Sequence, residues 1–260
     1  MSTRIQIVSD IHLEFHSAES AKRFVQEMDP SGVDVLVLAG DVANTRTLTK
    51  ALFDICERYA ASTVVFVHGN HELYGGTPGI VETLLRHATA KLPNLRVLDD
   101  QITEVGGVVF AGTPLWFRDD PLNVPLEAHL NDFHQISGFK PWVYERNRRA
   151  EAFLRDALSV ETGPRAVDVV VTHHLPSDAC VSPKYRGDTL NRFFVAPIAD
   201  ELPRLPQVWL YGHTHDAGDA EHRGCRFVCN PHGYITERRC AGYVPKLVLE
   251  VEHREATPAE

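Results

Sequence analysis

Three features of the sequence predict an α/β fold. Short runs rich in β-branched residues alternate with longer stretches whose apolar residues recur at helical spacing. The short runs are apolar throughout, as expected for parallel strands that are covered on both faces. Each of the first runs ends in Gly, Ser or His, which favour the end of a strand. The first three strands are expected at residues 5–8, 33–38 and 64–67.

Helices are expected after these strands. Leu48, Leu52 and Ile55 recur at helical spacing, so one apolar stripe can face the sheet. Strand, helix and strand repeated in this order favour parallel strands joined by helices. The helices expected in this part of the chain occupy residues 17–28, 45–60 and 77–91.

The later part of the chain predicts further strands and a mixed sheet. Gly106 and Gly107 lie between two apolar runs and indicate a hairpin, because glycine adopts positive φ in tight turns. A charged amphipathic helix is expected at 144–160, ended by residues 162–164. The remaining strands are expected at 94–98, 101–105, 108–112, 167–172, 207–211, 225–229 and 246–252.

Two segments, 113–143 and 175–194, fit neither pattern. The first carries proline and aromatic residues with little periodicity, and the second mixes Pro, Lys, Arg and Phe. Long irregular segments inside a compact domain are uncommon and tend to be functional. We therefore expect both to form walls of a substrate site. The chain has no repeat, low-complexity segment or linker, so we expect one domain over residues 1–260.

The composition excludes several classes of protein. With 43% hydrophobic and 23% charged residues, the chain of 260 residues is typical of a globular protein. No apolar run approaches the ~20 residues that span a bilayer, and the start lacks the features of a signal peptide. A formal net charge of −9 argues against broad binding to extended nucleic acid. Five scattered cysteines argue against a disulfide framework, so a cytoplasmic location is expected.

Fourteen histidines are an unusual number, and several lie beside Gly, Asp or another His. Five short motifs follow predicted strands directly. Because ligands bind outside the carboxyl ends of strands in open α/β sheets, we expect these motifs to converge on one site. The motifs are Asp10-Ile11-His12, Gly40-Asp41, Gly69-Asn70-His71-Glu72, Thr172-His173-His174 and Gly212-His213-Thr214-His215.

The spacing and chemistry of these motifs predict a metal site. On an extended chain, Asp10 and His12 point the same way, and so do His213 and His215. Imidazoles together with carboxylates suit first-row transition metals, and a site with only two carboxylates keeps positive charge for phosphoryl oxygens. The candidates are too many for one ion and suit two ions about 3.5–4 Å apart, bridged by a carboxylate. The seven candidates are Asp10, His12, Asp41, Asn70, His173, His213 and His215.

In this order, the motifs resemble those of the calcineurin-like metallophosphoesterase superfamily. The resemblance extends from residue 4 to about residue 235. The sequence Thr-His-His-Leu-Pro-Ser and residues 230–234 resemble a small bacterial branch. One departure is that Gly40-Asp41 lacks the further Asp often found after it. The resemblance implies a four-layer sandwich of two mixed β-sheets flanked by helices, with a dinuclear metal site at the carboxyl ends of the strands.

The resemblance also implies how the ligands divide between two divalent ions. His173 competes with His174 as a ligand; His173 is favoured because it comes first after its strand. His174 would then either support the ligand residues or contact substrate. Manganese is the favoured metal, with iron, zinc, cobalt or nickel as alternatives. One ion would bind Asp10, His12 and His215, the other Asn70, His173 and His213, and Asp41 would bridge them.

The activity implied by the resemblance is hydrolysis of phosphate mono- or diesters, with a metal-bridging hydroxide as nucleophile. Asn70 and His71 would stabilise charge on the phosphoryl oxygens, and His71 would protonate the leaving group. Arg118 and Arg186, on the irregular segments, are candidate contacts to a small phosphate-ester substrate, nucleotides included. Glu72 is expected to support its loop.

An alternative is a non-catalytic protein of the same fold that binds a protein partner. Missing ligands would favour this interpretation, but all seven candidate positions are filled. A nuclease is disfavoured by the acidic charge balance and the absence of a basic stripe. The sequence gives no sign of an obligate protein partner or of membrane association.

Overall fold

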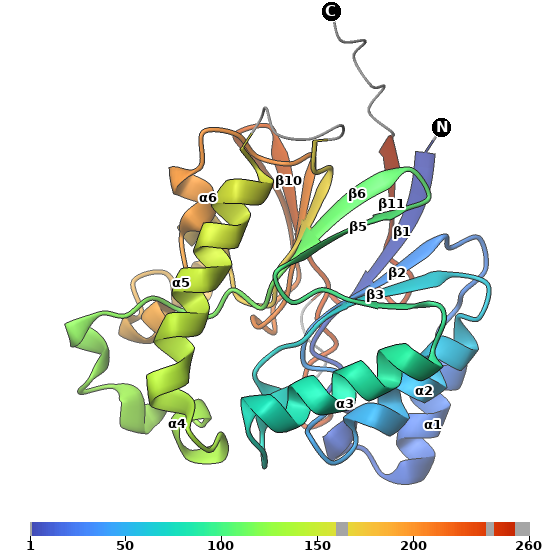
Figure 1. Ribbon diagram of the computed structural model, residues 1–260, viewed down its shortest axis with the longest axis horizontal. Coiled ribbons are helices and arrows are strands. Elements are labelled where there is room, and N and C mark those ends of the chain that lie inside the picture. The colour runs from blue at the N-terminus through green and yellow to red at the C-terminus, as the bar shows by residue number, and fades with distance from the viewer. Residues whose placement is uncertain (1, 160–165, 238–241, 253–260) are drawn as a thin grey trace, which may run out of the picture.

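The computed structural model describes residues 2–159, 166–237 and 242–252. Two β-sheets pack face to face, and helices cover the outer face of each (Figure 1). Both sheets contain parallel and antiparallel strand pairs. The predicted α/β class, with two mixed sheets flanked by helices, is therefore confirmed. None of the described helices is both long and apolar enough to cross a membrane.

Five strands form the first sheet, in the order β11 (Val248–Glu252), β1 (Ser2–Val8), β2 (Val35–Ala39), β3 (Thr63–Val67) and β4 (Leu95–Val97). Strands β1 to β4 pair in parallel, whereas β11 is antiparallel to β1. The helices of this half are α1 (Ala18–Glu27), α2 (Leu48–Arg58) and α3 (Pro78–Lys91). All of these elements lie within three residues of their predicted bounds.

Strand β2 shows why the predicted strands are apolar along their whole length. Leu36 and Leu38 pack in the core beneath the helices, while Val35 and Val37 pack in the core between the sheets. All four side chains are fully buried. Complete burial of such a side chain contributes roughly 1.5–3 kcal/mol. Both faces of the strand therefore lie in hydrophobic cores, which removes the alternation seen in half-exposed strands.

Six strands form the second sheet, in the order β5 (Gln101–Val105), β6 (Val108–Gly112), β7 (Val169–Val171), β8 (Val208–Tyr211), β10 (Cys225–Cys229) and β9 (Gly218–His222). The four central strands are parallel neighbours, and β5 and β9 are antiparallel edge strands. The predicted hairpin between β5 and β6 is confirmed, with φ of 58° at Gly106 and 84° at Gly107. Glycine reaches such angles without steric penalty.

Several elements of this half differ from the prediction, among them β9 and α5. Strand β9 is absent from the predicted strands because its residues are mostly polar and exposed; backbone pairing to β10 defines it. Helix α5 (Phe139–Ala157) begins five residues before the predicted start, and Pro141 lies in its first turn. Proline is tolerated there because the first N–H groups of a helix have no partner within it. The predicted stop at residues 162–164 lies outside the described residues.

The irregular segments 113–143 and 175–194 pack against each other. The ring of Phe117 lies 5.1 Å from that of Phe193, and Trp116 lies 5.3 Å from Phe139 of α5, measured between centroids. Trp116, Phe117 and Phe193 are fully buried. Aromatic side chains of both segments thus pack together, and they extend the hydrophobic core that lies beneath the helices of the first sheet. The two segments are held as one unit beside the ends of the strands.

Candidate metal centre

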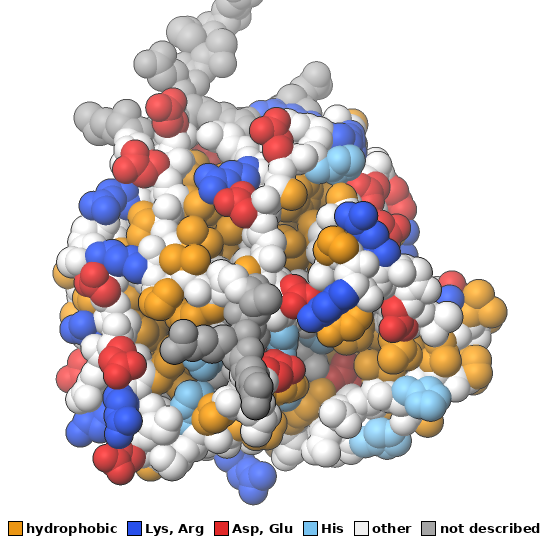
Figure 2. Space-filling model, turned by 180° about the vertical axis from the view of Figure 1, so that it is seen from behind, with side chains coloured by type: hydrophobic (Ala, Val, Ile, Leu, Met, Phe, Trp, Pro, Cys, Tyr) orange, Lys and Arg blue, Asp and Glu red, His pale blue; other side chains and the backbone are white. Residues whose placement is uncertain are grey.

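The five predicted motifs meet at the carboxyl ends of five parallel strands. Strands β1, β2 and β3 of the first sheet and β7 and β8 of the second deliver them, so both sheets contribute to one site. On the face shown in Figure 2, histidine side chains are visible within a hollow of the surface. The residues that the strand ends bring together are Asp10, Asp41, Asn70, His173 and His213.

The backbone at these strand ends differs from the extended one that the spacing argument assumed. Strand β1 ends at Val8, and Asp10 and His12 both have φ of 52°. Asp41 and His213 are also left-handed, with φ of 55° and 66°. Asp, Asn and His tolerate this conformation better than most residues, and such strained positions cluster at functional sites. The side chains of the motifs do lie close together, as expected. Sharp turns of the backbone after the strands bring them together, and the alternation of side chains along a strand does not.

Asp10, His12 and His215 form one potential ligand cluster. The Nε2 atoms of His12 and His215 are 3.1 Å apart, and His215 Nε2 lies 3.8 Å from Asp10 Oδ1. The outer Nδ1–H of His215 donates to Glu237 at 2.7 Å, and Nδ1 of His12 lies 3.4 Å from Glu14. Because the Nδ1 protons of His12 and His215 both point outward, the lone pairs of their two Nε2 atoms face each other inside the cluster. A cation between them relieves their repulsion.

Asp41, His173 and His213 form a second cluster. His173 donates its Nδ1–H to the carbonyl of Ala39 at 2.9 Å, so its Nε2 faces inward, 3.4 Å from Asp41 Oδ1. The same Nε2 lies 3.1 Å from Oδ1 of Asn70. His213 Nε2 is buried without a hydrogen-bond partner, an arrangement that is rare unless another ligand completes it.

The carboxylate of Asp41 joins the two clusters. Its Oδ2 is 3.9 Å from His12 Nε2 in the first, while its Oδ1 contacts His173 in the second. Burial opposes its ionisation, yet the imidazole of His173 holds the pKa of Asp41 well below its usual range. Burial lowers the pKa of His173, but the nearby carboxylate of Asp41 outweighs this effect and raises the pKa to about 10. Nitrogen and carboxylate donors with orphaned lone pairs fit two divalent transition-metal ions.

His174 points away from both clusters. Its Nδ1–H donates to the carbonyl of Pro114 at 3.3 Å, and its ring packs 4.9 Å from Trp116 and 4.2 Å from His213. Burial and the neighbouring His173 hold the pKa of His174 well below its usual value, so the ring is neutral. The side chain is fully buried and does not line the cavity described below. The structure therefore brings His173, and not His174, to the ligand cluster. The contacts of His174 with Pro114 and His213 suit a residue that supports the ligands.

Asn70 is held in one orientation by a residue that the motifs did not reveal. Its amide nitrogen donates to Asp132 at 2.8 Å and to the hydroxyl of Tyr74 at 3.0 Å, and Tyr74 donates to Asp132 at 2.6 Å. Asp132 is only 2% exposed. Both amide protons of Asn70 are thus engaged, which leaves its oxygen to face His173. Asn70 can act as an oxygen ligand, but it has no proton left to stabilise phosphoryl oxygens as predicted.

The sequence predicts that His71 points away from the metal ions, but its ring lies close enough to His12 and Asp41 to form a third potential ligand group with them. Its Nδ1 lies 2.8 Å from Glu14, its Nε2 lies 3.2 Å from the hydroxyl of Tyr234, and its backbone N–H donates to Asp41 at 2.9 Å. Burial disfavours the charged ring, but Asp41 and Glu14 outweigh it and raise the pKa of His71. The protonated ring is thus favoured at this position next to the clusters.

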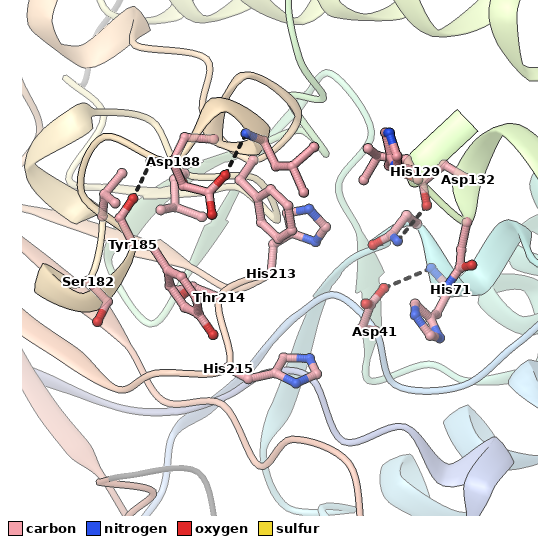
Figure 3. Close-up of a pocket in the computed structure, with 18 of the residues that line it drawn as sticks. Asp41, His71, His129, Asp132, Ser182, Tyr185, Asp188, His213, Thr214 and His215 are labelled. Carbon is pink, nitrogen blue, oxygen red and sulfur yellow. Dashed lines mark hydrogen bonds between the residues drawn. The ribbon is translucent and has the colours of Figure 1, made fainter. Parts of the chain in front are cut away.

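A cavity of about 350 Å³ opens onto these residues, and Figure 3 shows its two walls. Asp41, His71 and Asp132 lie on one side, with His213 and His215 opposite. Residues from both irregular segments complete the lining, as expected. They include His129, Leu130, Ser182, Tyr185 and Asp188.

The two arginines predicted to contact substrate are not among the residues that line this cavity. Arg118 is bound by Glu151 of α5 at 2.5 Å and by Glu201 of α6 (Ile198–Glu201) at 2.6 Å. Arg186 is exposed at the surface of the second irregular segment. Carboxylates of two other elements hold Arg118 in place. The sequence around Arg118 gives no sign of these distant partners. Neither arginine is retained as a substrate contact.

Glu72 supports the loops that carry the ligands. It is fully buried and accepts the backbone N–H groups of Gly69, Asp41, Val42 and Ala43 at 2.5, 3.0, 2.7 and 3.1 Å. The expected supporting role agrees with these contacts. One carboxylate thus ties the turn after β2 to the turn after β3.

We expect Glu72→Gln to lower the free energy of unfolding by about 2–4 kcal/mol, because an amide cannot accept from N–H groups on both sides. Urea unfolding of the two proteins measures the difference. Glu82→Gln, which alters an exposed carboxylate of α3, is the matched control and changes stability by less than about 0.5 kcal/mol. An equally stable Glu72→Gln protein would show that the loops do not depend on this carboxylate.

Two mixed sheets that join their strand ends at histidine- and carboxylate-rich clusters define a metallophosphoesterase fold. The sequence model of this class, described as calcineurin-like phosphoesterase, matches residues 3–217. The chain belongs to the calcineurin-like phosphoesterase family. This confirms the resemblance on which the ligand assignments depend.

Comparisons with individual proteins agree with this fold assignment. The protein L509 of Acanthamoeba polyphaga mimivirus, whose name gives no function, is 23% identical over 267 residues, covering 90% of this chain and 92% of the viral protein. The crystal structure of phosphopantetheinyl hydrolase from Mycobacterium tuberculosis has a TM-score of 0.69 and 16% identity, covering 100% of this chain and 99% of that one. A dimetal phosphatase from Danio rerio has a TM-score of 0.55 and 13% identity, covering 97% and 99%. At these identities the solved structures establish the fold.

Proposed function

We propose that this protein hydrolyses small phosphate esters with the help of two divalent cations. The observation that carries the proposal is that two ligand clusters share the carboxylate of Asp41. Family membership supports a metal-dependent phosphoester hydrolase in general. A non-catalytic protein would have no need of buried, unpartnered lone pairs such as those of Asp10 and His213.

The proposed ligands follow the two clusters. Manganese is the metal we propose, and a set dominated by imidazole also accepts iron, zinc, cobalt or nickel. When bound, the ions would supply Lewis-acid chemistry: activation of water and neutralisation of phosphoryl charge. One ion would be held by Asp10, His12 and His215, the second by Asn70, His173 and His213, with Asp41 between them.

The chain itself supplies orientation and a proton. Glu237 and Ala39 fix the tautomers of His215 and His173 by accepting their Nδ1 protons. Glu14 in the same way directs Nε2 of His71 toward the cavity, where that atom would hold the proton for the departing oxygen. General-acid catalysis of this kind is typically worth about 10²–10⁴-fold in rate.

Metal analysis and a substrate panel test the proposal together. Protein purified without chelator should contain two divalent transition-metal ions per chain. It should hydrolyse nitrophenyl phosphate, bis(nitrophenyl) phosphate or both, lose this activity to a chelator and regain it with Mn²⁺. A tenfold preference within the panel would distinguish monoesterase from diesterase. A folded chain that binds no metal would contradict the proposal and favour a non-catalytic, partner-binding role.

A further inference from the structure

We propose that the cavity beside the metal clusters selects phosphate esters whose organic group is uncharged and apolar, and that it disfavours substrates with a second anionic group. This inference rests on the proposed hydrolase function, because it assumes that the clusters bind the phosphate. Two features of the cavity wall carry it. One is a set of apolar side chains next to the candidate ligand His213, and the other is the charge of the side chains around them.

The apolar wall comes from the second irregular segment. Leu175, Val181, Leu190 and Phe194 all line the cavity. The ring of Phe194 stacks on His213, with centroids 4.4 Å apart and planes 28° from parallel. The organic group of an ester whose phosphate lies at the clusters would therefore meet apolar surface directly.

The described part of the cavity wall offers no lysine or arginine to a second anionic group. Lys184, nearby in sequence, donates to Asp216 at 2.7 Å, and its ammonium lies 4.7 Å from the ring centre of Tyr185. Arg192 lies 3.6 Å from Asp120 and donates to Asn123 at 3.3 Å. The acidic partners of both side chains, Asp216 and Asp120, are not among the residues that line the cavity, whereas Tyr185 is.

Apart from the histidines, the charged side chains that line the cavity beyond the ligands are acidic. Asp132, Asp188 and Glu237 contribute carboxylates. Asp188 is exposed and uses one oxygen to accept the N–H of Leu190 at 2.8 Å. A distal phosphate or carboxylate would approach these acidic side chains, and no lysine or arginine of the described residues lines the cavity to offset them. Binding should therefore weaken when an anionic group is added to the organic part.

The volume of about 350 Å³ is at the lower end of the usual range for small-molecule sites. It suits a phosphate with a short alkyl or single-ring group. Burial of one methylene strengthens binding by about fourfold, since about 0.8 kcal/mol is gained per group. From methyl to pentyl, this amounts to about 100-fold or more.

Binding of phosphonates to the manganese-loaded protein tests the inference without turnover. Methyl, propyl and pentyl phosphonate are compared with 2-carboxyethyl phosphonate, an anionic analogue of the propyl compound, by titration calorimetry. We expect tighter binding along the alkyl series and at least tenfold weaker binding of the carboxylate than of propyl phosphonate. Equal affinities for these two, or no gain from methyl to pentyl, would overturn the inference. If neither phosphate nor any phosphonate bound the loaded protein, the proposed function itself would fail.

A charge variant in the wall provides a second test. Leu190→Lys should largely remove the preference, strengthening 2-carboxyethyl phosphonate by about tenfold relative to propyl phosphonate. Ile102→Lys, on the exposed edge strand β5 with its side chain 52% exposed, is the matched control and should leave both affinities unchanged. Unfolding curves establish that both variants are folded. An unchanged ratio in folded Leu190→Lys would show that this wall does not contact the organic group.

Discussion

Replacing Asp41 with asparagine is expected to lower kcat/KM by at least about 10³-fold, which corresponds to about 4 kcal/mol of transition-state stabilisation. The two oxygens of this carboxylate face different clusters, toward His12 and His173. An amide keeps one oxygen, which can still accept the N–H of His71, but it has lost the charge and the second oxygen. Metal content should therefore fall from two ions per chain to one or none, measured by elemental analysis.

The variant should fold, because asparagine tolerates the left-handed backbone of Asp41 as well as aspartate does. Asp100→Asn is a matched control: Asp100 also has a positive φ, of 57°, and also accepts hydrogen bonds, but it does not line the cavity. The control should retain both ions and full turnover. Two ions and normal turnover in Asp41→Asn would show that no bridging carboxylate is needed.

The fold was largely predictable because the parallel strands are covered on both faces. Strand β2 illustrates this. Each of its residues faces one of two hydrophobic cores, so burial requires an apolar residue at every position of the strand. Strand β9 lacks this signal, since it pairs only at the sheet edge through its backbone. Pro141 suggested a loop, but the first turn of α5 tolerates it. Sequence patterns thus reveal elements that are stabilised by burial and miss those defined by backbone pairing alone.

The grouping of the candidate metal ligands was predictable for a related reason. Each one follows a strand directly, so topology alone brings Asp10, Asp41 and His173 to the same edge. The residues that orient them carry no such signal. Asp132 lies on a segment far from Asn70 along the chain, and no spacing relates the two. Only the packing of the irregular segments against the strand ends creates that contact.

Substrate contacts were the least predictable part of the site. Arg118 has the chemistry of a phosphate ligand, yet two carboxylates on α5 and α6 engage it. His174 has a ligand's chemistry and position in the motif, yet it donates to Pro114 behind the cluster. In both cases the partner comes from another element. The chemistry of a side chain indicates what it can bind, whereas its neighbours determine whether it is available.

His71→Ala is expected to reduce turnover by about 10²–10⁴-fold for esters with poor leaving groups, such as alkyl phosphates. The ring holds its proton at the cavity because Glu14 engages Nδ1, and because Asp41 and Glu14 raise its pKa against the effect of burial. Esters of nitrophenol should lose much less, since nitrophenolate departs without protonation. The backbone N–H that donates to Asp41 is unaffected, so both metal ions should be retained.

The dependence on the leaving group separates acid catalysis from a structural role. We expect a plot of log(kcat/KM) against leaving-group pKa to become steeper in His71→Ala, whereas a distorted site would lower all substrates alike. Glu14→Gln should give the same pattern with a smaller loss, because it weakens the hold on His71 without removing the ring. His87→Ala, which removes an exposed histidine of α3, is the control and should change neither slope nor rate. Equal losses for nitrophenyl and alkyl esters in His71→Ala would assign the proton to another group, and the hydroxyl of Tyr234, 3.2 Å from His71 Nε2, would be the next to test.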